Sequence, residues 1–258
     1  MSIKNLHLAV SGQGPALVLV HGWGLNSLVW QPIQAELEQH FEVHLIDLAG
    51  FGLSRDVPVA DELDGWAKMA VEAVDKPAIW LGWSLGGLIA TQVALHYPDQ
   101  VEQLVTVASS PKFSTSKDWQ GIKPQVLSLF QQQLQQDFSK TLERFLAIQA
   151  MGSDSARQDI LALKNILSAR PLPNPQALEI GLELLDKVDL RKHLSKVDVP
   201  FFRIYGRLDS LVSQKLIAEI DALAPQSQCV ILPKASHAPF ISHKVEFLEA
   251  LLGFLLQK

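Results

Sequence analysis

The chain has 258 residues, of which 48% are hydrophobic and 19% are charged, and this composition excludes an intrinsically disordered protein. Its length allows one large α/β domain or a smaller one that carries an insertion. Because 22 Lys and Arg residues stand against 27 Asp and Glu residues, the net charge is −5, and we expect no nucleic acid partner.

Three features of the sequence bear on where the protein works. The only cysteine, Cys229, has no second cysteine to pair with, so nothing requires an oxidising compartment. The first ten residues lack the long apolar stretch and the cleavage site of a signal peptide. The longest apolar runs, such as residues 16–20, are too short to cross a bilayer. We therefore expect a cytoplasmic protein without a membrane partner, and we take it to be a monomer.

Short apolar runs alternate along the chain with longer segments of helical periodicity. The predicted strands are residues 16–20, 43–47, 78–82, 104–108, 201–206 and 228–232, and the predicted helices between them are residues 30–40, 63–74, 86–97, 213–223 and 244–255. Near-continuous apolar strands are typical of a parallel sheet covered on both faces. The pattern predicts an α/β fold with a mostly parallel central sheet flanked by helices, and sites at the carboxyl ends of the strands.

The segment from residue 112 to residue 187 interrupts this alternation. It contains no convincing strand, and its apolar residues recur at helical spacing from Val126 to Leu146, from Ile160 to Leu167 and from Gln176 to Leu185. Ordinary crossover helices are the alternative explanation, but the distance between the flanking strands favours an insertion. We therefore predict a catalytic core of residues 1–111 and 188–258 with an all-helical cap, or lid, of residues 112–187.

The residues Gly82-Trp83-Ser84-Leu85-Gly86-Gly87 follow a predicted strand and precede a predicted helix. In this setting the G-x-S-x-G pattern forms a sharp turn that presents the serine hydroxyl above the sheet. Gly82 and Gly86 are needed because side chains there would collide with the neighbouring helix and strand. The alternative is a glycine-rich turn with an incidental serine. The setting favours Ser84 as a nucleophile.

A serine hydroxyl needs a base, and in this kind of fold the acid and then the histidine follow the serine in sequence. Asp209 lies just past a predicted strand and is the best acid, while His237 follows the strand at 228–232 and is the best base. His243 is the second choice, because it stands at the start of the last predicted helix and not directly after a strand. A metal site built on His237 and His243 would lack a third ligand, so we predict no metal. Asp47 precedes Ser84 and is assigned a structural role.

Backbone N–H groups that stabilise an oxyanion would complete such a site. The residues His21-Gly22-Trp23-Gly24 follow the first predicted strand, the position from which this fold donates one N–H. We assign the two donors to Trp23 and Leu85, and we expect His21 to order the loop. A plain glycine turn after the strand is the alternative.

Together these motifs resemble the α/β-hydrolase superfamily over the whole chain. Six segments resemble more closely the pimeloyl-[acyl-carrier protein] methyl ester esterases of biotin synthesis, the BioH family: residues 21–26, 82–87, 105–111, 119–124, 144–149 and 237–243. The resemblance implies an α/β-hydrolase fold and a cofactor-free serine carboxylesterase that releases methanol from the methyl ester of a pimeloyl chain on acyl carrier protein. Ala49 departs from the proline that relatives usually have there, and we expect a change in the turn without loss of activity.

The resemblance also implies roles for individual residues. Ser84, Asp209 and His237 match the catalytic triad, and Trp23 and Leu85 match the oxyanion and substrate-contact positions. The cap residues that match acyl-chain contacts are Phe145, Leu146, Ala147, Ile148 and Gln149.

The larger, N-terminal part of the cap is basic although the chain is acidic. From Lys112 to Arg170 there are eight Lys and Arg residues and five Asp and Glu residues. Charge alone leaves open a solvated face with ordinary ion pairs, for example around Glu143. The resemblance favours docking of acyl carrier protein and its phosphopantetheine phosphate. The candidate docking residues are Lys140, Arg144, Arg157 and Lys164. Leu161 stands where some relatives have a further arginine, so this chain has fewer candidate docking residues.

Two other functions stay open at this point. One is a short-chain carboxylesterase of broad specificity that has no connection with biotin. The other is a binding protein of the same fold that has lost catalysis, against which the intact Ser84, Asp209 and His237 argue.

Overall fold

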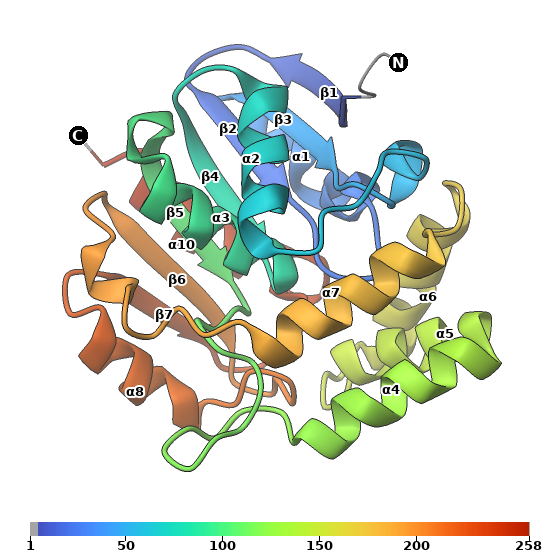
Figure 1. Ribbon diagram of the computed structural model, residues 1–258. Coiled ribbons are helices and arrows are strands. Elements are labelled where there is room, and N and C mark those ends of the chain that lie inside the picture. Colours follow the sequence, from blue (N-terminus) through green and yellow to red (C-terminus); the bar gives the residue numbers. More distant parts are fainter. Residues whose placement is uncertain (1–4, 258) are drawn as a thin grey trace.

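The computed structural model describes residues 5–257. Residue 258 and the first four residues, on which part of the signal-peptide prediction rests, lie outside the described part. One sheet organises the fold, in the order β1-β3-β2-β4-β5-β6-β7 (Figure 1). Its strands are β1 (His7–Gly12), β2 (Ala16–Val20), β3 (Glu42–Asp47), β4 (Ala78–Trp83), β5 (Val101–Val107), β6 (Phe201–Gly206) and β7 (Gln228–Leu232). Only β1 runs antiparallel to its neighbour, so the predicted mostly parallel sheet is confirmed.

Strand β1 is the one strand that the apolar pattern did not reveal. It pairs with β3 at the edge of the sheet, from His7 opposite Asp47 to Gly12 opposite Glu42. Its residues are half-buried or exposed, in contrast to the fully buried β2. An edge strand exposed to water needs no continuous apolar run, and its pairing with β3 becomes visible only in the tertiary structure.

The helices of the α/β part lie close to their predicted positions. They are α1 (Gln31–Leu37), α2 (Leu63–Val74), α3 (Leu85–His96), α8 (Lys215–Leu223) and α10 (Lys244–Leu255). The short helix α9 (Pro239–Ser242) was not predicted from the sequence. Contacts join α2 to α3 and α1 to α10, and the two pairs cover opposite faces of the sheet (Figure 1). Helix α1 is shorter than predicted because it ends at Leu37 and residues 38–40 form a turn, and a 3-10 helix, η1 (Ser27–Trp30), precedes it. No helix in residues 5–257 is long and apolar enough to cross a membrane.

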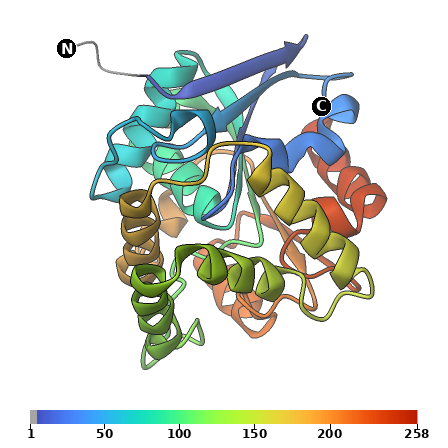
Figure 2. The same cartoon turned by 90° about the vertical axis from the view of Figure 1, so that its right-hand side faces the viewer.

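Four consecutive helices fill most of the segment 112–187. They are α4 (Pro124–Gln136), α5 (Phe138–Gln149), α6 (Ala156–Ser168) and α7 (Pro175–Lys187). Contacts run from α4 to α5 and α7, and from α5 to α6. Figures 1 and 2 show the four helices gathered in one group beside the sheet, coloured from green to orange. Within the segment, strand-like pairing is limited to two isolated bridges at residues 114–122.

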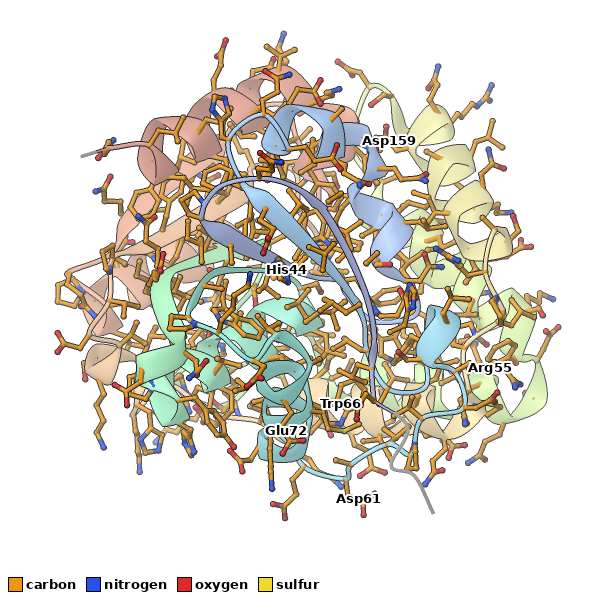
Figure 3. All side chains as sticks on the ribbon, turned by 90° about the horizontal axis from the view of Figure 1, so that it is seen from above. His44, Arg55, Asp61, Trp66, Glu72 and Asp159 are labelled. Atoms are coloured by element: carbon orange, nitrogen blue, oxygen red, sulfur yellow. The ribbon has the colours of Figure 1, made fainter. Side chains whose placement is uncertain are left out.

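This helical group is tied to the α/β part by hydrogen bonds from loops at the ends of strands. Trp23 Nε1 donates to the Leu178 carbonyl at 2.9 Å, and Asn26 Nδ2 donates to the Ile166 carbonyl at 3.2 Å. Arg55 Nε donates to the Leu172 carbonyl at 2.9 Å, and Figure 3 shows Arg55 on the side of these helices. The loops that follow β2 and β3 therefore hold the helical group over the same edge of the sheet.

Candidate active site

Ser84 lies in the sharp turn between β4 and α3. Its φ of 55° and ψ of −118° are strained for a residue with a side chain. The turn is held by β5, because the Ser84 N–H donates to the Val107 carbonyl at 2.9 Å and Ser109 Oγ donates to the Ser84 carbonyl at 2.8 Å. The strained backbone carries the hydroxyl out of the sheet at the N-terminus of α3, as expected for a nucleophile turn.

The glycines on either side of Ser84 are required for the steric reason predicted from the sequence. A Cβ on Gly82 would lie 2.1 Å from the Gly86 carbonyl oxygen of α3, and a Cβ on Gly86 would lie 2.3 Å from the Val20 carbonyl oxygen of β2. Both contacts are with backbone, which cannot move aside. Glycine at these positions lets the turn sit directly on the sheet.

Asp209 and His237 come from different loops and meet beside this turn. The distance from His237 Nδ1 to Asp209 Oδ2 is 2.8 Å, and both side chains are buried. Asp209 Oδ1 accepts the N–H groups of Leu211 at 2.8 Å and Val212 at 3.0 Å. These donors hold the carboxylate in one orientation, so Oδ2 can fix the proton of His237 on Nδ1 and leave Nε2 as an acceptor.

Two further observations concern His237. Nε2 is buried and forms no hydrogen bond with any residue in the part of the chain that the structure describes. The indole Nε1 of Trp83 donates to the His237 backbone carbonyl at 2.8 Å. Sequence reasoning did not find this second contact, since Trp83 stands next to the serine but 154 positions from the histidine. A free Nε2 is the atom that a general base requires.

The loop after β2 supplies the other predicted donor. The backbone N–H groups of Trp23 and Leu85 donate to no described residue, and Leu85 begins α3, where N–H groups lack partners within the helix. His21 accepts the Leu48 N–H on Nε2 at 3.1 Å and its Nδ1 lies 2.8 Å from the Gly22 carbonyl. Burial lowers the pKa of His21, so the imidazole is neutral at pH 7 and orders this loop, as predicted.

Asp47 has the structural role assigned to it. Its Oδ1 accepts the Ser27 N–H at 2.7 Å and its Oδ2 accepts the Leu53 N–H at 2.8 Å. Both donors belong to loops that follow strands of the sheet. His243 is the residue before α10, as predicted, and its Nδ1 lies 2.9 Å from Ser242 Oγ.

A small apolar cavity opens between Ser84 and the helical group. Its lining residues are Ser84, Phe113, Ile122, Val126, Leu127, Phe130, Phe145, Leu185 and Leu211. Only Ser84 and Phe145 were predicted to contact a substrate. Val126, Leu127, Phe130 and Leu185 belong to apolar helix faces that are visible in the sequence, but the spacing does not tell which positions face Ser84. Phe113, Ile122 and Leu211 lie outside the helices, and no periodic pattern marks them.

The predicted acyl-contact residues of α5 divide into two groups. Phe145 lines the cavity and packs edge to face on Trp23 at a ring distance of 4.6 Å. Leu146 and Gln149 are buried on the same side of α5. Ala147 is exposed, Ile148 is half-buried, and neither lines the cavity.

The predicted docking residues also divide. Lys140 and Arg144 are exposed and border an open groove between α4 and α5, together with Gln133, Gln136, Asp137 and Thr141. Arg157 is exposed on α6. Lys164 Nζ lies 2.9 Å from Glu143 Oε2, so its charge is paired within the helical group.

Comparison with known proteins agrees with this arrangement. The chain matches the family model of the alpha/beta hydrolase fold over residues 15–244. It is 51% identical over 250 residues to a pimeloyl-[acyl-carrier protein] methyl ester esterase of Vibrio vulnificus strain CMCP6, covering 97% of this chain and 98% of that protein. A protein of the same name from Aliivibrio fischeri is 50% identical and covers 98% of both chains.

A solved structure, a bromoperoxidase from Bacillus anthracis, superimposes with a TM-score of 0.87 at 24% identity, covering 98% of this chain and 95% of that one. This likeness concerns the fold alone. The family match covers most of the chain, and the two esterase relatives span nearly all of it. The chain therefore belongs to the α/β-hydrolase family and, within it, to the family of pimeloyl-[acyl-carrier protein] methyl ester esterases.

Proposed function

We propose that this protein hydrolyses the methyl ester of pimeloyl-[acyl-carrier protein] in biotin synthesis, with Ser84 as nucleophile, His237 as base and Asp209 as the group that orients the base. The observation that carries the chemistry is the 2.8 Å contact of Asp209 with His237 beside the strained Ser84 turn. The names of the relatives that are about 50% identical support the substrate.

In the first half of the reaction Ser84 Oγ attacks the carbonyl carbon of the methyl ester. His237 Nε2 takes the hydroxyl proton, and the carbonyl oxygen becomes an oxyanion. The N–H groups of Trp23 and Leu85 stabilise that charge, and such donors contribute about 3 kcal/mol each to the transition state. When the carbon–oxygen bond to the methoxy group breaks, His237 returns the proton and methanol leaves.

In the second half a water molecule attacks the acyl-enzyme. His237 Nε2 takes one proton from the water and then gives it to Ser84 Oγ as the acyl bond breaks. The products are the free distal carboxyl group of the pimeloyl chain, still carried at its other end, and the regenerated serine.

We further propose that residues 112–187 act as a cap on the core formed by residues 1–111 and 188–258. The cap supplies most of the apolar cavity beside Ser84, which suits a chain of methylene groups. On this basis Phe145 contacts the acyl chain directly, while Leu146 and Gln149 support the cavity wall from the buried side of α5.

The carrier would dock on the basic face of the cap. Lys140 and Arg144 border one groove, Arg157 lies on the next helix, and all three side chains are exposed. Free exposed cations attract an acidic partner and its phosphate. Lys164 contributes less, because its pairing with Glu143 neutralises it. In this reaction the protein acts as a cytoplasmic monomer without cofactor or metal.

The decisive experiment compares kcat/KM for pimeloyl-[acyl-carrier protein] methyl ester with kcat/KM for short free esters. We expect a large preference for the carrier-bound ester, and loss of both activities in Ser84→Ala. Equal values for the two substrates would instead indicate a short-chain esterase of broad specificity. Failure of a fluorophosphonate probe to label Ser84 would indicate a binding protein without catalysis.

A further inference from the structure

The loop that carries His237 is attached to the cap by its neighbour Ser236. The Ser236 hydroxyl lies 3.0 Å from the Gln149 carbonyl oxygen and 2.9 Å from the Met151 carbonyl oxygen. The single hydroxyl proton is shared between the two carbonyl oxygens, and because Ser236 is only 2% exposed, water does not compete for it. Both acceptors lie at the C-terminal end of α5, where carbonyls lack partners within the helix.

The backbone of His237 is held from two sides as well. Its N–H donates to the Gln149 carbonyl at 3.1 Å, and its own carbonyl accepts the Trp83 indole N–H at 2.8 Å. One contact comes from the cap and the other from the residue beside the nucleophile. Since Nε2 forms no hydrogen bond with a described residue, these backbone contacts and Asp209 determine where the imidazole points.

The helix that anchors this loop is also a wall of the substrate cavity. Phe145 of α5 lines the cavity, and Gln149 is one helical turn further along the same helix. A turn of helix is rigid and about 5.4 Å long. A displacement of α5 at Phe145 is therefore transmitted to the carbonyl of Gln149, and through it to Ser236 and His237.

We propose that Ser236 is a positioning residue that couples the filling of the α5 cavity to the alignment of His237 with Ser84. This inference rests on the proposed function, because it takes His237 as the base. It assigns the bonds from Ser236 to Gln149 and Met151 a role in turnover rather than in substrate binding alone. An acyl chain that fits the cavity then promotes its own hydrolysis, because it brings His237 into alignment with Ser84.

The test uses the full chain, p-nitrophenyl acetate and p-nitrophenyl heptanoate, and the variants Ser236→Ala and Ser236→Cys. Cysteine keeps the buried volume but is a weak donor, so it separates packing from hydrogen bonding and carries the test if the alanine variant does not fold. Ser242→Ala is the matched control, since Ser242 is in the same segment and bonds only to its own helix and to His243.

We expect both Ser236 variants to lower kcat on the heptanoate about tenfold with KM changed less than twofold. Ser242→Ala should stay within twofold of the parent protein. In a double-mutant cycle, Phe145→Ala should lower kcat on the heptanoate in the parent background, and by less than twofold once Ser236 is alanine.

Three results would overturn the coupling: a kcat within twofold of the parent in Ser236→Ala, full activity in Ser236→Cys, or effects of Phe145 and Ser236 that simply multiply. The generic esters keep this test separate from the substrate assignment. Turnover of these esters without turnover of the carrier-bound ester would contradict the proposed substrate and leave the Ser236 comparison valid. Turnover of both that survives Ser84→Ala would contradict the proposed nucleophile instead.

Discussion

Replacing Asp209 with asparagine tests how the proposed base is oriented. The two carboxylate oxygens have different partners: Oδ1 accepts two backbone N–H groups, at 2.8 and 3.0 Å, and Oδ2 faces His237 Nδ1 at 2.8 Å. Asparagine has a single oxygen. The two N–H groups require that oxygen as their acceptor, so the NH₂ group must face His237.

This geometry sets the size of the effect. An NH₂ group can only donate to Nδ1, so the proton of the neutral imidazole moves to Nε2. Nε2 can then no longer take the proton of Ser84. In serine proteases the same substitution costs about 10⁴ in kcat through the wrong tautomer. At about 1.36 kcal/mol per tenfold, this is about 5 kcal/mol of transition-state stabilisation.

The assay is kcat on p-nitrophenyl heptanoate at pH 7, with Tm measured for each variant. Asp47→Asn is a matched control, because Asp47 is also buried at a strand end and its carboxylate accepts two backbone N–H groups, but it forms no hydrogen bond with a histidine among the described residues. We expect it to lose stability while kcat stays within about tenfold. A loss of less than tenfold in kcat for a folded Asp209→Asn protein would refute the tautomer argument.

Two other predictions concern surface charges. Reversing Lys140, Arg144 and Arg157 to glutamate should lower kcat/KM for the carrier-bound ester by at least tenfold and leave kcat/KM for p-nitrophenyl acetate unchanged. Both substrates are measured at the same ionic strength, and equal losses on the two would contradict the docking surface. Hydrogen bonds from Arg191 at 2.6 and 2.8 Å lower the pKa of Asp189 to about 2. The pair therefore stabilises the folded protein fully above about pH 4, and this stabilisation is lost as the pH falls through 2. In urea unfolding, the Asp189→Asn variant should be less stable than the parent protein by about 1–2 kcal/mol at pH 7, after allowance for solvent screening. The difference between the two proteins should shrink below pH 4. A difference that does not depend on pH would contradict the assignment.

Much of the fold is visible in the sequence because burial leaves a periodic pattern. Strands β2, β6 and β7 and helices α2 and α10 have the predicted bounds, since their apolar runs end at turn residues or polar positions. The edge strand β1 escaped prediction for the opposite reason. It buries little apolar surface and is held by pairing with β3, which local sequence does not encode.

The site follows the same division. The turn around Ser84 is predictable because the two glycines, the serine and the flanking elements are contiguous in sequence, and their steric requirements are local. Asp209 and His237 were predictable as strand-end residues. Their meeting at 2.8 Å depends on the order in which parallel strands lie side by side, which brings the carboxyl ends of distant segments together.

What the sequence determined by itself was therefore chemistry and periodicity: a mostly parallel sheet, three helical stretches between residues 112 and 187, and the candidate nucleophile, base and acid. Only the tertiary structure decided which residues of the helical group face Ser84, that Glu143 pairs with Lys164, and that Trp83 and Ser236 hold the histidine loop. The residues that these contacts bring together are separated in the sequence by between 21 and 154 positions. They depend on how packed helices and loops meet in space, and no local propensity specifies that.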